Sequence, residues 1–172
     1  MKRIPLSLFT FLFLLSGLCA APTKTVWQIG EKNHSASELA LSPDKYKEFL
    51  ANDFGWEDRF YIIGLSSPQK DFPYVLPGPA DHWGGTSYTA GIRTHVLNIL
   101  FGMKEVPETD SWKLIIDLLD THHELPALFK ITINGKSWKY ALPKGSGKSI
   151  DGDYSQIKPH TIEIPLNSGV IR

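Results

Sequence analysis

The dipeptide Asn134-Gly135 constrains the fold more than any other feature of the sequence, because it lies between two segments rich in apolar residues. A two-residue type I′ turn needs positive φ at both central positions, and asparagine and glycine tolerate this at low cost. The sequence therefore predicts a β-hairpin over 128–142 whose register is fixed by the turn.

In that register Ile131 faces Trp138 across the hairpin, and successive residues alternate between the two faces. One face is apolar and the other is polar, the two sets being Phe129, Ile131, Trp138, Tyr140 and Lys130, Thr132, Ser137, Lys139. Two strands alone bury too little area to offset the entropy lost on ordering them. The hairpin therefore needs a second sheet over its apolar face.

Other segments have the aromatic and β-branched composition of short strands. They are 25–30, 59–65, 92–101, 112–120 and 160–166. The two longer strands, 92–101 and 112–120, are expected in the middle of a sheet. In the last strand Ile162, Ile164 and Leu166 share one face. Many short strands predict an all-β fold of the β-sandwich type.

One helix is expected near Ser42, which can cap it, with Pro43 at the first position and an apolar stripe of Tyr46, Phe49 and Leu50. Prolines and glycines then interrupt the segment 68–91, which predicts a long loop with a short extended piece at 72–76. Its aromatic residues favour an ordered loop.

Residues 1–20 have the pattern of a secretory signal peptide. Lys2 and Arg3 precede an apolar run, and small residues follow it. The run is too short for a membrane span, so the domain is expected to comprise 21–172 and the protein to be secreted or periplasmic. A lipid anchor on Cys19 is the alternative, disfavoured because Leu18 occupies the position where a lipoprotein signal has a small residue.

Without that leader the chain has 18 − 2 = 16 basic and 18 acidic side chains and no cysteine. The near balance argues against nucleic acid and against an anionic membrane as partners. A neutral sugar or a modestly charged polymer, meaning a polysaccharide or oligosaccharide, fits better. The missing cysteines exclude a disulfide framework and a cysteine-bound zinc.

Four short motifs occur in order along the chain: Trp27-Gln-Ile-Gly30, Ile131-Thr-Ile-Asn-Gly135, Asp151-Gly-Asp-Tyr154 and His160-Thr-Ile-Glu-Ile-Pro165. Together they resemble the C-terminal, carbohydrate-binding-like domain of the rhamnogalacturonan lyases, polysaccharide lyase family four. The resemblance covers roughly 25–172.

The resemblance implies a galactose-binding-domain-like jelly-roll β-sandwich with one short helix, from which the final strands are missing. The basic catalytic residues of those lyases belong to another domain, so no catalytic residue is expected in this chain. A catalytic domain downstream of Arg172 is an expected partner.

The segment Asp81-His82-Trp83-Gly84-Gly85 is the candidate sugar site, because a ring flanked by hydrogen-bonding side chains can stack on a pyranose and bind its hydroxyls. Tyr88 and Arg93 complete the candidate carbohydrate-binding set, with Arg93 available for a uronate carboxylate. The alternatives are that Trp83 belongs to the core and that Arg93 pairs with an acidic side chain.

The run His122-His123-Glu124, with Asp117 and Asp120 upstream, is better explained as a surface turn than as a metal site, because adjacent residues of an extended chain point to opposite faces. Asp151 and Asp153 offer the oxygen ligands that calcium takes, and a plain turn is the other interpretation. No cofactor is expected.

The favoured hypothesis is a secreted, non-catalytic carbohydrate-binding module of a polysaccharide-degrading protein. One alternative is the N-terminal fragment of a longer polysaccharide lyase or glycoside hydrolase whose catalytic part lies beyond Arg172. Another is a structural sandwich that docks a neighbouring domain and binds no ligand.

Overall fold

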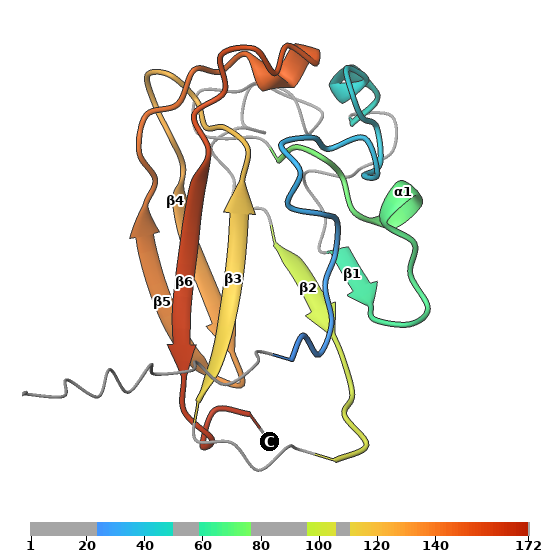
Figure 1. The fold of residues 1–172 in the computed structure, drawn as a ribbon, viewed down its shortest axis with the longest axis vertical. Helices are drawn as coiled ribbons and strands as arrows, with labels where there is room; N and C mark the ends of the chain where they lie inside the picture. The colour runs from blue at the N-terminus through green and yellow to red at the C-terminus, as the bar shows by residue number, and fades with distance from the viewer. Residues whose placement is uncertain (1–23, 50–58, 77–95, 106–110, 172) are drawn as a thin grey trace, which may run out of the picture.

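The computed structural model describes residues 24–49, 59–76, 96–105 and 111–171. Within them the chain is mostly strand, arranged as three two-stranded sheets. The strands are β1 (Arg59–Ile62), β2 (Leu97–Leu100), β3 (Trp112–Leu118), β4 (Leu128–Ile133), β5 (Lys136–Ala141) and β6 (His160–Leu166). Figure 1 shows the β3–β6 pair in front of the β4–β5 pair, with β1–β2 to one side. The expectation of a β-rich chain with one short α-helix is confirmed at this level.

The β4–β5 hairpin has the predicted register, with Ile131 opposite Trp138 and Lys130 opposite Lys139. Asn134 and Gly135 adopt φ values of 45° and 84°, as the type I′ turn requires. The Asn134 side chain also donates a hydrogen bond of 2.7 Å to the carbonyl oxygen of Val170. The turn is thereby attached to the C-terminal segment.

A second antiparallel pair joins β3 to β6, with Leu114 opposite Ile164 and Ile116 opposite Ile162. The alternating pattern of β6 is confirmed, since Ile162, Ile164 and Leu166 are buried and the residues between them are exposed. Within the described residues β3 has one partner strand and β2 has one partner strand. The predicted central position of these two strands is therefore not what the described sheets show.

The apolar faces of the two antiparallel pairs meet in one hydrophobic cluster. Its buried members are Ile131, Ile162, Ile164, Leu166, Val170 and Ile171. Half-buried side chains of β3, β4 and β5, among them Trp112, Phe129 and Trp138, pack against them. The hairpin thus has the second sheet that its apolar face requires.

The parallel pair β1–β2 occupies the other side of the molecule and aligns Tyr61 with Ile99. Tyr61 is buried, and its ring meets the edge of the Phe72 ring at a centroid distance of 5.7 Å. The segment 72–74 is joined to Ala40, whose N–H donates to the carbonyl oxygen of Phe72.

The short helix does not lie where the sequence predicts it. Residues Tyr46–Phe49 form a single 3₁₀ turn, η1, and the α-helical turn α1 comprises Pro68–Asp71, inside the segment expected to be a loop. Pro68 suits the first helical position after Ser67, and the Asp71 carboxylate accepts the Ser67 N–H at 2.7 Å. Both turns have four residues, too few to form an isolated helix in water, so their conformation depends on local hydrogen bonds and tertiary contacts more than on capping residues.

The segment 25–30 was expected to be a strand, but it pairs with no described strand. Its Trp27 ring instead contacts Phe101, at a centroid distance of 5.3 Å. The contact is made by side chains, which a strand propensity does not anticipate.

Candidate functional site

The carbohydrate-binding residues expected from the sequence, Asp81, His82, Trp83, Tyr88 and Arg93, lie outside the described residues. Their assignment stays a prediction. The candidate sites that the structure can test are the loops after β3 and β5 and the outer faces of the strand pairs.

Asp120, two residues after the end of β3, is bound by the loop that follows β5. Its carboxylate accepts hydrogen bonds from the Ser146 N–H at 2.7 Å, from the Ser146 hydroxyl at 2.5 Å and from the Lys148 N–H at 3.2 Å. Partial burial works to raise the pKa of Asp120, but these hydrogen bonds hold it below its usual value. A Cβ at Gly145 would overlap the Thr121 carbonyl and the Asp120 carboxylate, so this loop needs glycine there. This contact between Asp120 and the Ser146 loop was not predicted from the sequence, in which Gly145-Ser146-Gly147 was the pattern that could have indicated it.

The histidines of the candidate metal cluster form part of a turn. The rings of His122 and His123 stack at a centroid distance of 4.6 Å. His122 Nδ1 accepts the N–H groups of Glu124 and Leu125 at 3.1 and 3.0 Å. That nitrogen is therefore occupied by the backbone and is not offered to a metal.

The carboxylates considered for metal or calcium also have protein partners. Asp153 Oδ1 accepts the N–H and the hydroxyl of Ser155 at 3.0 and 2.6 Å, and the Gly152 N–H donates to the Ser149 carbonyl oxygen at 3.1 Å. The segment 149–155 is therefore hydrogen-bonded within itself. In the part of the chain that the structure describes, no group of three or more histidine, cysteine or acidic side chains is arranged to hold a metal ion.

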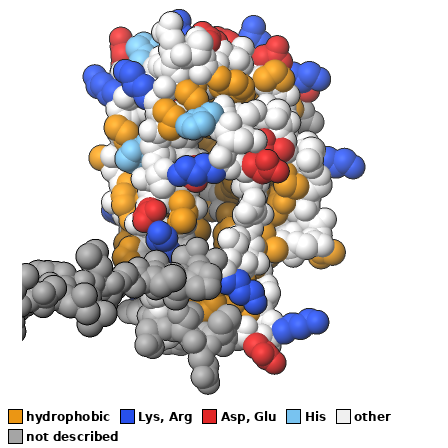
Figure 2. All heavy atoms as spheres, in the orientation of Figure 1, with side chains coloured by type: hydrophobic (Ala, Val, Ile, Leu, Met, Phe, Trp, Pro, Cys, Tyr) orange, Lys and Arg blue, Asp and Glu red, His pale blue; other side chains and the backbone are white. Residues whose placement is uncertain are grey.

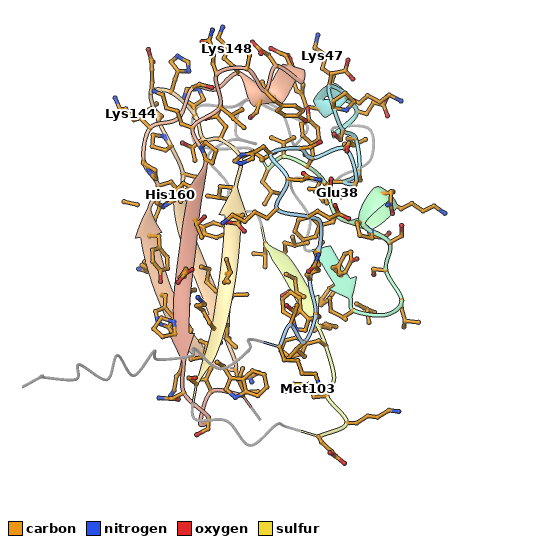
Figure 3. The ribbon with its side chains drawn as sticks, in the orientation of Figure 1. Glu38, Lys47, Met103, Lys144, Lys148 and His160 are labelled. Carbon is orange, nitrogen blue, oxygen red and sulfur yellow. The ribbon has the colours of Figure 1, made fainter. Side chains whose placement is uncertain are left out.

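One described hollow is lined by residues 24–26 and 102–105 and has a volume of about 260 Å³. It is open to solvent, and Met103 lies on its wall (Figure 3). Sites for small ligands are more enclosed and generally exceed about 300 Å³. With this volume and this exposure to solvent, the hollow does not define a binding site.

The outer face of β3–β6 is electrically balanced. Lys113 Nζ lies 3.1 Å from Glu163 Oε2. Asp117 Oδ1 lies 2.7 Å from Lys32 Nζ and accepts the Thr161 hydroxyl at 2.6 Å. Figure 2 shows acidic and basic side chains beside one another on this side of the molecule. Burial works to raise the pKa of Asp117, but its bonds to Lys32 and Thr161 hold the pKa below its usual value.

The outer face of β4–β5 has a different composition. It carries the exposed residues Lys130, Thr132, Ser137 and Lys139, which we call the lysine face. The Thr132 and Ser137 hydroxyls are hydrogen-bonded to each other at 2.7 Å. The sequence predicted this pairing through the hairpin register but did not identify two opposed lysines as a candidate site.

The outer face of β1–β2 is mostly apolar, with Asn98 as the polar partner of Phe60. Phe60, Ile62 and Leu100 are 59%, 38% and 47% exposed, and the adjacent Leu65 is 82% exposed. Isolated exposed apolar residues are ordinary, but several on one face mark a surface suited to contact with another protein surface.

The described residues define a small β-rich module in which apolar side chains fill the space between strand pairs, while polar chemistry lies in loops and on outer faces. The chain belongs to the CBM-like family of polysaccharide lyase family 4, domain III, whose model matches residues 25–169. The resemblance found in the sequence is thereby confirmed. No match was found among curated proteins or among solved structures. No helix of the described residues is long and apolar enough to cross a membrane.

Proposed function

We propose that this domain binds polysaccharide as a non-catalytic accessory module of a secreted, pectin- or rhamnogalacturonan-degrading protein. The observation that carries the proposal is the match of residues 25–169 to a carbohydrate-binding-module-like domain. In this proposal residues 1–20 are a signal peptide, residues 21–172 form a jelly-roll sandwich, and the catalytic groups belong to another domain.

The polar groups of the described loops support a binding role over a catalytic one. Asp120 and His122 in these loops accept hydrogen bonds from the domain itself, and so does Asp117 on β3. Such groups stabilise loops, and a general acid or base must instead reach a substrate proton. The hydrogen bonds within the loops after β3 and β5 therefore suit these loops to form part of a rigid binding surface.

The predicted contact is stacking of Trp83 on a sugar ring, with hydrogen bonds from Asp81 and His82. The test is affinity for a panel of neutral and acidic plant polysaccharides, measured with the parent protein and with Trp83→Ala. Loss of an aromatic anchor should remove about 1–3 kcal/mol of binding free energy, and the urea midpoint should stay near that of the parent.

Trp138→Phe is the matched control, because Trp138 packs against the core. It should lower the urea midpoint and leave the affinity unchanged. A Trp83→Ala protein that loses stability instead of affinity would assign Trp83 to the core and overturn the site.

The mostly apolar outer face of β1–β2 favours a second role, docking of a neighbouring domain. The two roles give different results in the same panel. If no polysaccharide binds the parent protein, the binding proposal fails and docking is the function that the exposed Phe60, Ile62 and Leu65 support.

A further inference from the structure

The lysine face places two like charges directly opposite each other. Lys130 and Lys139 are cross-strand partners in the β4–β5 register, and both side chains are exposed. Their neighbours on this face are the pairs Thr132–Ser137 and Leu128–Ala141, so neither strand places an acidic residue on this face. Like charges opposite each other destabilise a strand pair, and the hairpin therefore carries a cost that its own fold does not require.

Neither lysine has an ion-pair partner among the described residues, whereas Lys113 and Lys32 on the β3–β6 side each have one. Lys144, in the loop that follows β5, also has none within the described part of the chain and projects outward in Figure 3. The hairpin side of the module thus presents unpaired positive charge, although the whole chain has a formal net charge of zero.

We propose that the lysine face binds the carboxylates of a uronate-containing polysaccharide. This inference rests on the proposed function, since it names the class of carbohydrate and a surface that contacts it. A carboxylate between Lys130 and Lys139 relieves their mutual repulsion and makes charge-assisted hydrogen bonds to both ammonium groups.

The two hydroxyls of the face suit the same ligand. Thr132 and Ser137 are bonded to each other, and each hydroxyl oxygen retains acceptor capacity for a sugar hydroxyl. The face is the surface of two paired strands, which suits an extended polymer better than a buried monosaccharide. Lysine ammonium groups are strongly hydrated, so we expect modest affinity that falls as salt rises.

The experiment compares two forms of one polymer, polygalacturonate with free carboxylates and the same polymer after methyl esterification. Binding is measured with the full parent protein, with the Lys130→Gln/Lys139→Gln double variant and with two controls. Lys136→Gln lies in the same hairpin but opposite Ile133, on the other face, and Lys113→Gln lies on the outer face of β3.

We expect the parent to bind the acidic polymer more tightly than the ester, and the double variant to bind the acidic polymer about tenfold more weakly. The controls should bind like the parent. Since the double variant loses a like-charge contact, its urea midpoint should be equal to or above that of the parent, which separates lost binding from lost folding.

Equal binding of both polymer forms, or unchanged binding by the double variant, would overturn the lysine face and leave the proposed function standing. If neither form binds and a wider panel of neutral and acidic polysaccharides is also silent, the proposed function fails, and this inference fails with it.

Discussion

The β3–β6 pair and the β4–β5 hairpin turn apolar faces toward the same core, but their outer faces differ in charge. On β3–β6 each described charge has an opposite partner, as in Lys113–Glu163 and Lys32–Asp117. On β4–β5, Lys130 lies opposite Lys139, and no acidic side chain of these two described strands lies on that face. The inner faces stabilise the fold in the same way, so the difference between the outer faces points to a role outside folding.

The two strand pairs also differ in how their strands are connected along the chain. A two-residue turn joins β4 to β5, whereas the loops and the whole hairpin separate β3 from β6 in the sequence. The hairpin register is therefore set locally by Asn134 and Gly135, and the β3–β6 register is set by burial of Ile162, Ile164 and Leu166.

The largest expected effect tests whether the inner face carries the stability. Ile164 is 0% exposed, and Ile164→Ala should lower the free energy of unfolding by about 2–5 kcal/mol through lost burial and the cavity left behind. The measurement is urea denaturation followed by tryptophan fluorescence.

The matched control is Ile115→Ala, on the outer face of the same strand pair, where the side chain is 47% exposed. Its effect should stay within about 0.5 kcal/mol. Similar losses at the two positions would contradict the assignment of stability to the inner face.

The next effect tests the local closure of the hairpin. Gly135 has φ of 84°, and a Cβ there would meet no atom within 4 Å, so only backbone strain opposes a side chain. Gly135→Val should therefore cost about 1–3 kcal/mol in unfolding free energy, measured by the urea midpoint.

Gly135→Asn is the control, because asparagine tolerates the left-handed region and should cost less than valine. A valine variant with the midpoint of the parent would remove the argument that this turn fixes the register.

Features of the fold that depend on neighbouring residues were predictable from the sequence, and features that depend on distant contacts were not. The turn at Asn134-Gly135 and the alternation of Ile162, Ile164 and Leu166 were predictable because each depends on neighbouring residues. The pairing of β3 with β6 was not, since alternation identifies a buried face but not the strand beside it. The predicted helix near Ser42 is only a 3₁₀ turn at 46–49, and the α-helical turn lies at 68–71, where a loop was predicted. Short helices depend on tertiary contacts more than on capping residues.

The candidate site was predictable to a smaller extent. The register already placed Lys130 opposite Lys139, but that pair becomes informative only when the structure shows which acidic side chains are absent from its face. The Asp120–Ser146 contact requires two loops to meet, which no local pattern encodes. The assignments of Asp81, His82, Trp83, Tyr88 and Arg93 remain predictions, because these residues lie outside the described part of the chain.

The smallest expected effect is also the most direct test of the difference between the two outer faces. The same lysine-to-glutamate substitution should raise the free energy of unfolding on one face and lower it on the other. Lys139→Glu places a carboxylate opposite Lys130 and replaces repulsion with attraction, so the free energy of unfolding should rise by about 0.2–1 kcal/mol. Lys113→Glu places a carboxylate where Lys113 now meets Glu163 at 3.1 Å, so the free energy of unfolding should fall by a similar amount.

Both differences should shrink as salt is added, because the side chains are exposed and screened. The measurement is the urea midpoint of the two variants and the parent at low and high ionic strength. Because Lys139→Glu also removes a cation from the lysine face, this more stable protein should bind the acidic polymer less well than the parent. If both substitutions changed the free energy of unfolding in the same direction, the two outer faces would be electrostatically alike. The unpaired charge of the lysine face would then no longer support a ligand there.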